Sequence, residues 1–449
     1  MFVQRTLLSE SEKPIATHYR ILLMSWAGWV FDFYDLILYT FLLIPIKKEM
    51  NFTDVEVSYV LGASLAATAI GGVIFGYLSD RYGRKKVLQW TILTFSIGTF
   101  FSGLSTGIFM LLIFRIITGL GVGGEWGTGQ TYVGESFPPR MRGRFGALMQ
   151  TGAPVGIALA SIIGGYVAPE IGWRWCFFIS VLPALLVVYI RKALPESDMW
   201  EAAREVKNIP THKPVGQTFL SDHKPVGQTF LSDQKSVGQT FLSVHQRNRL
   251  TVLFSPAYRK YFILALILAI FDMSAYWFTY SWMPGYLHEQ RNFSLTKSAV
   301  WMLITQAGGF IGYTTFGMVA DKLGRRPAYT IYSFIMALGL VSITIFWDEI
   351  VIHQTLILGC MFLVGFGTGM FGGYGPLFSE LFPTNIRSTA MGAAFNLARG
   401  VQFFTPVIIA TVAVQYGLSG GISIAAIFAL LTGIWIWTFP ETKGKKLIT

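Results

Sequence analysis

Long apolar runs divide the chain at regular intervals. The first, ILLMSWAGWVFDFYDLILYTFLLI, covers residues 21–44 and is long enough to cross a bilayer as a helix. Eleven more runs of similar length lie at 57–79, 87–106, 108–130, 145–168, 174–191, 259–284, 299–320, 328–346, 354–378, 390–414 and 418–439. The pattern predicts an all-α polytopic membrane protein with twelve transmembrane helices.

The basic residues indicate the orientation of these helices. If the N-terminus is inside, the inner segments hold 28 of the 35 Lys and Arg residues. The outer loops then hold five, Lys47, Lys48, Arg174, Arg291 and Lys297, and the last two lie inside spans. Positive residues remain on the cytoplasmic side, so we expect an inner (plasma) membrane protein with both termini in the cytoplasm. The net charge of +11 therefore reflects topology and contact with membrane lipid, and does not indicate nucleic-acid binding.

The two halves of the chain resemble each other. The repeated segments are GYLSDRYGRKK (76–86) with GMVADKLGRRP (317–327), FD (31–32) with FD (271–272), and ESFPPRMR (135–142) with ELFPTNIR (380–387). We therefore expect two pseudo-symmetric six-helix bundles, 1–195 and 257–449, which hold substrate between them and rock against each other.

A linker, residues 196–256, is expected between the bundles. Three 11-residue units repeat in it over 212–244, beginning with HKPVGQTFLSD. Gly and Pro in each unit disfavour a helix. We interpret the repeat as a cytoplasmic linker, with a partner-binding segment as the alternative.

Three motifs resemble those of the major facilitator superfamily. They are DRYGRK (80–85), its second copy DKLGRR (321–326), and RIITGLG (115–121). The segments DFYD (32–35), TGLGVGGEWGTGQTYVGES (118–136) and NLAR (396–399) are most similar to the branch of organic-acid:proton symporters for sialate and monocarboxylates. The resemblance implies the major facilitator fold and secondary active transport, not an enzyme. Sugar porters share the PES and PETKG segments, but their QLS element is missing here.

One group of charged residues and glycines recurs at the cytoplasmic helix ends of both halves. An Asp at a helix end can pair with an Arg from the next loop and hold the bundles together in one state. We interpret the group as a conformational latch, with simple positive-inside anchoring as the alternative. Its members are Asp80, Gly83, Arg84, Glu135 and Arg142, and then Asp321, Gly324, Arg325, Glu380 and Arg387.

Several ionisable residues fall inside predicted spans, where they are costly and therefore candidates for function. Asp32 and Asp35 are three residues apart and are expected to share a helix face and a proton. The alternative is that one of them caps a broken helix or pairs with a base. Glu125 has no acidic counterpart in the second half, which favours a coupling role. Arg115 is a plausible partner for a span-1 Asp, either in proton release or as a structural ion pair.

Arg399 is the principal candidate for binding a substrate carboxylate, because a guanidinium suits a carboxylate in bidentate geometry. Asn396 and Gln402 are each three residues away and extend a polar stripe. Asp272 is a candidate partner of Arg399, in a permanent pair or in a gate that substrate opens, and Tyr276 is a candidate cavity residue.

These residues predict a monomeric transporter that imports a small organic acid by proton symport. The proton is the coupling ion, and no metal or organic cofactor is expected. A sugar or polyol:proton symporter of the same superfamily is the first alternative, and a transporter-like nutrient sensor the second.

Overall fold

The structure is a computed structural model that describes residues 8–208 and 252–447, except residues 12, 53, 183, 281–282, 284–285, 293–294 and 446. Within that part of the chain every regular element is helical. The predicted 212–244 repeat lies outside the described residues.

The first half forms one bundle of six membrane-crossing segments. Its helices are α1 (Ala16–Met50), α2 (Asp54–Tyr82), α3 (Arg84–Gly103), α4 (Ile108–Ser136), α5 (Arg142–Gln150), α6 (Gly152–Ile162), the π-turn η2 (Ile163–Val167), α7 (Ala168–Ile171), α8 (Trp173–Ile179) and α9 (Ala184–Ala193). Helices α5 to α7 together make the fifth crossing, and α8 with α9 makes the sixth. Helix α10 (Asp198–Asn208) follows at the start of the predicted linker, where the Trp200 indole N–H donates to the Asp80 carbonyl.

The second half forms the other bundle. Its helices are α13 (Arg259–Tyr280), η3 (Tyr286–Gln290), α15 (Leu295–Leu323), α16 (Arg325–Thr344), α17 (Trp347–Ile350), α18 (Gln354–Gly367), η4 (Thr368–Gly373), α19 (Tyr374–Leu381), α20 (Arg387–Val401), η5 (Gln402–Phe404), α21 (Thr405–Trp435) and η6 (Ile436–Thr438). The tenth crossing runs from α18 to α19, and the eleventh runs from α20 into α21. Gly417 breaks α21 with a φ of 68°, so its remainder is the twelfth crossing.

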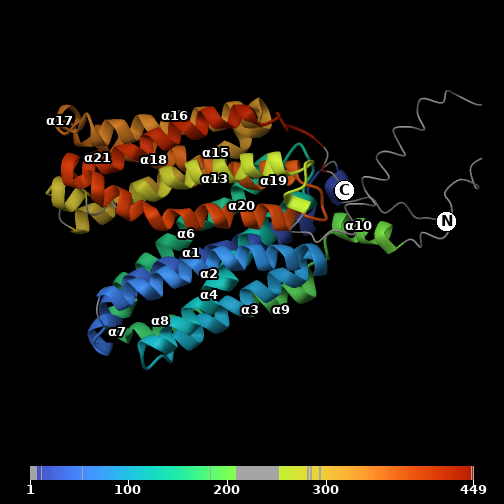
Figure 1. Cartoon of the computed structure of the whole chain (residues 1–449), viewed down its shortest axis with the longest axis horizontal. Helices are drawn as coiled ribbons and strands as arrows, with labels where there is room; N and C mark the ends of the chain where they lie inside the picture. The colour runs from blue at the N-terminus through green and yellow to red at the C-terminus, as the bar shows by residue number, and fades with distance from the viewer. Residues whose placement is uncertain are drawn as a thin grey trace, which may run out of the picture.

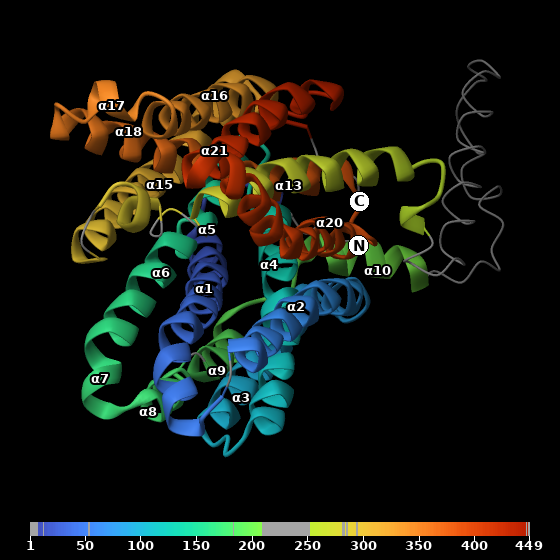
Figure 2. The same ribbon diagram turned by 60° about the vertical axis from the view of Figure 1, so that its left-hand side comes forward.

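The two bundles lie side by side and meet along part of their length (Figure 1). Helices α2 and α20 pack together across the interface, and so do α5 and α15. A turned view shows α20 beside α2 (Figure 2). In the same view α6 and α7 of the first bundle are well separated from α18 of the second. Both termini lie at one end of the molecule, called the termini side below, and α7 and α17 lie at the other (Figure 1).

Proline explains two of the helix interruptions. Pro has no backbone N–H, so the carbonyl four residues earlier loses its helical partner. Pro154 removes this bond from Gln150, where α5 ends, and Pro406 removes it from Gln402, where the 3₁₀ turn η5 begins. Spans 5 and 11 are therefore each interrupted by a local break.

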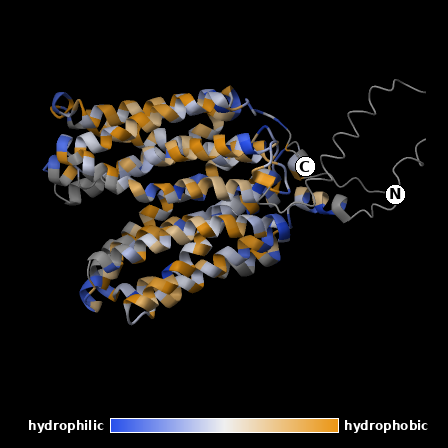
Figure 3. Cartoon of the chain, in the orientation of Figure 1, coloured by the Kyte–Doolittle hydropathy of each residue, from blue (hydrophilic) through white to orange (hydrophobic). Residues whose placement is uncertain are grey.

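The surface pattern is that of a membrane protein. Large apolar side chains point outward on many helices, such as Ile97, Phe334 and Ile434, while charged side chains including Arg84 and Glu125 are fully buried. Hydrophilic residues gather mainly at the two ends of the helices (Figure 3). In the described part of the chain, seven helices are individually long and apolar enough to span a membrane.

Candidate functional site

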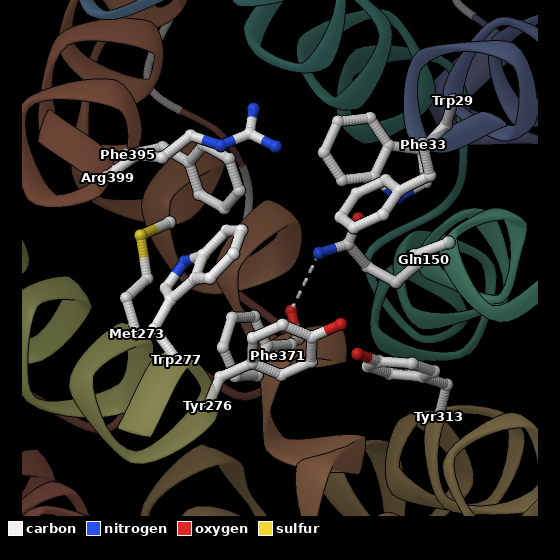
Figure 4. Close-up of a pocket in the computed structure, with 11 residues that line it drawn as sticks. Trp29, Phe33, Gln150, Met273, Tyr276, Trp277, Tyr313, Phe371, Phe395 and Arg399 are labelled. Atoms are coloured by element: carbon white, nitrogen blue, oxygen red, sulfur yellow. Dashed lines mark hydrogen bonds between the residues drawn. The ribbon is translucent and has the colours of Figure 1, made fainter. Parts of the chain in front are cut away.

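A small pocket, partly open, lies between the two bundles. Both bundles line it, and most of its walls are aromatic rings (Figure 4). Its residues are Trp29, Phe33, Gln150 and Ala153 from the first bundle, and Met273, Tyr276, Trp277, Tyr313, Phe371, Phe395 and Arg399 from the second.

Arg399 is the only cationic residue among the described residues that line this pocket. Its side chain extends from α20 toward the space beside Phe33 (Figure 4), and its guanidinium carbon lies 5.8 Å from the Phe33 ring centroid. Among the described residues it makes no ion pair within 4.0 Å, although it interacts electrostatically with Asp32 of the opposite bundle. The guanidinium is therefore available to an anion in the pocket.

Asp32 lies against Glu125 rather than sharing its site with Asp35. The Glu125 carboxyl from α4 occupies the space beside Gly28, one turn before Asp32 on α1, where an added Cβ would be 2.2 Å from Glu125 Oε1. The two acids are at most 1% exposed and interact with each other. Apart from each other, the described residues offer these carboxyl groups no hydrogen-bond partner. Two adjacent buried carboxyl groups favour retention of at least one proton.

Asp35 takes part in a separate, fully paired site. Arg115 donates to its two oxygens at 3.2 and 2.9 Å, and the Thr99 hydroxyl donates at 2.7 Å. The Arg115 guanidinium carbon also lies 4.6 Å from the centroid of the Tyr39 ring. A cation and a hydroxyl thus pair with Asp35 on its own side of α1 while Asp32 faces Glu125, so the structure does not bring the two Asp side chains together as the expected pair. The expected partnership of Arg115 with a span-1 Asp is present, as an ion pair.

Three of the residues expected to bind substrate lie elsewhere. The Asn396 amide donates to the Gly123 carbonyl of the opposite bundle at 2.9 Å, so it packs α20 against α4. Gln402 donates to the Ser274 hydroxyl and the Ala398 carbonyl inside its own bundle. Asp272 lies next to Tyr374 and makes no ion pair with Arg399 in the described structure. The polar stripe on α20 is thus divided among three environments, since residues three apart on a helix differ by about 60° in direction.

Tyr276 lines the pocket together with Arg399, but the remaining lining residues did not stand out in the sequence. Trp29, Phe33 and Trp277 are aromatic residues among many, and no local signal separates them from those facing lipid. Gln150 is occupied within the protein: it donates to the Phe371 carbonyl at 3.2 Å (Figure 4) and accepts from the Trp126 indole at 3.0 Å. The one sequence feature that could have marked Gln150 as a lining residue is its position just before the break at Pro154.

On the termini side, the acids and arginines expected to form a latch come together across the bundles. Asp80 accepts from the backbone N–H of Ser388 and Thr389 and from the Thr389 hydroxyl at 3.1, 2.8 and 2.6 Å, at the N-terminus of α20. Within its own bundle it accepts from Arg84 at 2.9 Å. Glu135 accepts from Arg84 at 2.8 Å and from Arg387 of the opposite bundle at 2.6 Å.

The second half repeats this arrangement. Asp321 accepts from the backbone N–H of Gly143 and Arg144 at 3.0 and 2.8 Å, at the N-terminus of α5. Arg325 pairs with Asp321 and with Glu380, both at 2.9 Å, and Arg142 reaches Glu380 across the interface at 3.4 Å. In this conformation the bundles are joined at the termini side by two related polar networks.

Gly83 and Gly324 form the turns that precede α3 and α16. Their φ values of 103° and 111° favour glycine. At each turn a Glu accepts from the first backbone N–H groups of the helix, Glu196 at α3 and Glu441 at α16. Burial raises the pKa of Glu196 despite these hydrogen bonds. Burial also acts to raise the pKa of Glu441, but four backbone N–H groups outweigh it and lower that pKa.

Known proteins share sequence and fold with this chain. The sequence pattern of the Major Facilitator Superfamily matches residues 24–401. The sialic acid transporter NanX of Escherichia coli is 30% identical over 423 residues, which cover 92% of this chain and 93% of that protein. The niacin transporter NiaP of Acinetobacter baylyi is 28% identical over 446 residues, covering 96% and 95%.

A solved structure of the proton:xylose symporter XylE superimposes with a TM-score of 0.76 over 96% of this chain and 98% of that one, at 21% identity. At that identity the likeness concerns the fold. With two bundles, a shared central pocket and a family match over most of its length, the chain belongs to the Major Facilitator Superfamily and is a membrane transporter, not an enzyme.

Proposed function

We propose that this transporter imports a small organic anion together with a proton. The observation that carries the proposal is Arg399, a guanidinium without an ion pair among the described residues, in a pocket lined by both bundles. A carboxylate fits such a group, and none of the described residues that line the pocket beside it is acidic. A sugar needs no cation there, so the single arginine favours an acid over a sugar or polyol.

The neighbouring acids supply a mechanism for coupling. Arg399 interacts with Asp32 across the bundles, and Asp32 is next to Glu125. In the empty site, a charged Asp32 compensates Arg399. When a proton neutralises Asp32, the guanidinium is left uncompensated and attracts the substrate anion. A site with the anion but no proton would bury an excess negative charge, and a site with the proton alone would bury an excess positive one. Both are costly in a membrane, so the two solutes move together.

The aromatic walls favour a flat acid. Trp29, Phe33, Tyr276 and Trp277 present ring faces and edges around Arg399, and the Gln150 amide is occupied by protein groups. A polyhydroxylated acid would need more free polar partners than this lining provides. The relatives named for niacin and for sialic acid represent these two kinds of substrate, and the pocket resembles what the first would need.

The positive-inside pattern supports a plasma or inner membrane orientation in which the termini side faces the cytoplasm. The termini-side networks would then close the cytoplasmic entrance and leave the pocket to be loaded from outside. We expect the carrier to act as a monomer, since one chain supplies both bundles and the whole pocket.

The test is uptake by the full-length protein in proteoliposomes. Labelled nicotinate, benzoate, pyruvate, lactate, sialate and xylose are each offered with and without an inward proton gradient. We expect gradient-driven uptake of at least one acid, lost in Arg399→Ala. The matched control is Arg204→Ala, an exposed arginine on α10 outside both bundles. Xylose uptake that persists in Arg399→Ala, or acid uptake that is the same with and without the proton gradient, would refute the proposal.

A further inference from the structure

Asp272 is a second buried acid that the proposed coupling does not use. It lies on α13 at the position that matches Asp32 in the repeated FD segment. Its side chain is fully buried, and no described residue makes an ion pair or a well-formed hydrogen bond with it. An isolated carboxylate in such surroundings is costly, so the neutral protonated acid is the favoured state in this conformation.

The groups that face Asp272 are three phenols from three helices. Tyr313 of α15, Tyr329 of α16 and Tyr374 of α19 all interact electrostatically with its carboxyl group, and the hydroxyl groups of Tyr329 and Tyr374 are buried without a hydrogen-bond partner among the described residues. From α20, the charged residue Arg399 interacts instead with Asp32 and Tyr276. The described surroundings of Asp272 therefore contain proton donors and acceptors but no compensating cation.

The three phenols connect two parts of the molecule. Tyr313 also lines the central pocket, where Figure 4 shows its hydroxyl directed toward the space between the rings. Tyr329 also interacts with Arg325, a member of the termini-side network. The phenols that interact with Asp272 thus connect the pocket with the part of the interface that must open when the carrier turns inward.

The two halves use the same position differently. In the first bundle Asp32 of α1 faces an acid on α4. In the second, Asp272 of α13 faces Tyr374, which lies one turn beyond the repeat position of Glu125. A position that only stabilised packing would not need a carboxyl group in each bundle, because an apolar side chain fills a buried site at lower cost.

We infer that Asp272 is a second proton-carrying group of the transport cycle, an inference that rests on the proposed function. It takes a proton from the pocket through Tyr313 and releases it on the termini side, past Tyr374 and Tyr329, when the network around Arg325 opens. The Asp32–Glu125 pair alone moves one proton with one monoanion and no net charge. With Asp272, two protons accompany each monoanion, and one positive charge enters per cycle.

The first test needs no substrate. Infrared spectra of the purified full-length protein report the carbonyl stretch of protonated carboxyl groups. We expect a component at neutral pH that is lost in Asp272→Asn and restored, with a shifted frequency, in Asp272→Glu. Asp35→Asn is the matched control, because it replaces a buried Asp of the first bundle that is ion-paired with Arg115. An identical band in wild type and Asp272→Asn would overturn the inference.

The second test measures charge movement. Nicotinate, benzoate, pyruvate and lactate are monoanions, and their uptake is followed with a potassium-diffusion potential at equal pH on both sides. For one net charge, an interior-negative potential of about 59 mV raises the equilibrium accumulation about tenfold. We expect this response in the wild type, while Asp272→Asn accumulates the same acid only under a pH gradient.

The outcomes separate the two proposals. Uptake driven by pH but not by potential in the wild type would overturn the role of Asp272 and leave proton symport intact. A potential response that persists in Asp272→Asn would do the same. If neither these four acids nor sialate accumulates, the proposed function fails, and the infrared band alone decides whether Asp272 holds a proton.

Discussion

Replacing Asp80 with Asn should shift the carrier toward the conformation that is open on the termini side. Asp80 accepts three hydrogen bonds from Ser388 and Thr389 of the opposite bundle. Hydrogen bonds to a charged group are worth about 1.5–3 kcal/mol each. Asn keeps one acceptor oxygen and loses the charge, so we expect a net loss of about 2–4 kcal/mol for the closed state. That corresponds to an about 30- to 700-fold change in the equilibrium.

The assay is a distance measurement between spin labels on the two bundles. Tyr82 and Leu323 are 39% and 53% exposed, lie at the termini-side ends of α2 and α15, and can be replaced by labelled cysteines. Cys176 and Cys360 are buried and free, and are replaced by Ala in this background. Double electron–electron resonance in lipid nanodiscs should show a longer-distance population in Asp80→Asn.

Two further variants calibrate the result. Asp321→Asn should give a smaller shift, since Asp321 accepts two cross-bundle hydrogen bonds and is slightly exposed. Asp348→Asn is the matched control, because its side chain is 92% exposed and its ion pair with Arg291 is 3.8 Å long. If Asp80→Asn gives the same distances as Asp348→Asn, the termini-side network does not hold the bundles together, and the anchoring interpretation is preferred.

Other substitutions test the remaining parts of the site. Arg115→Lys should lower uptake at least tenfold, because an ammonium cannot keep both bonds to Asp35, and normal uptake in a well-inserted variant would make this pair dispensable. Gly28→Ala should impair proton coupling, since its Cβ would displace the Glu125 carboxyl; a proton dependence of uptake equal to that of the wild type would count against the placement of Glu125 in coupling. Deletion of 212–244 should leave the uptake rate unchanged, and loss of activity in a well-expressed deletion would favour a partner-binding role.

The sequence by itself determined the architecture of this protein. Apolar runs of bilayer length, the distribution of Lys and Arg, and the repeated DRYGRK and DKLGRR segments predicted two six-helix bundles. These signals are local or periodic, and the hydrophobic effect of the bilayer acts on each of them directly. The breaks near Pro154 and Pro406 were also predictable, because a missing backbone N–H acts on the residue four positions earlier.

Only the tertiary structure decided which buried charges meet. Asp32 and Asp35 are three residues apart, yet one faces Glu125 and the other Arg115, since α4 supplies a different partner at each level. Asn396, Arg399 and Gln402 likewise share a helix, but only Arg399 lines the pocket. Helical spacing fixes the direction of a side chain relative to its own helix. The identity of its neighbour depends on how the helices are rotated and packed, and that is set by the fold as a whole.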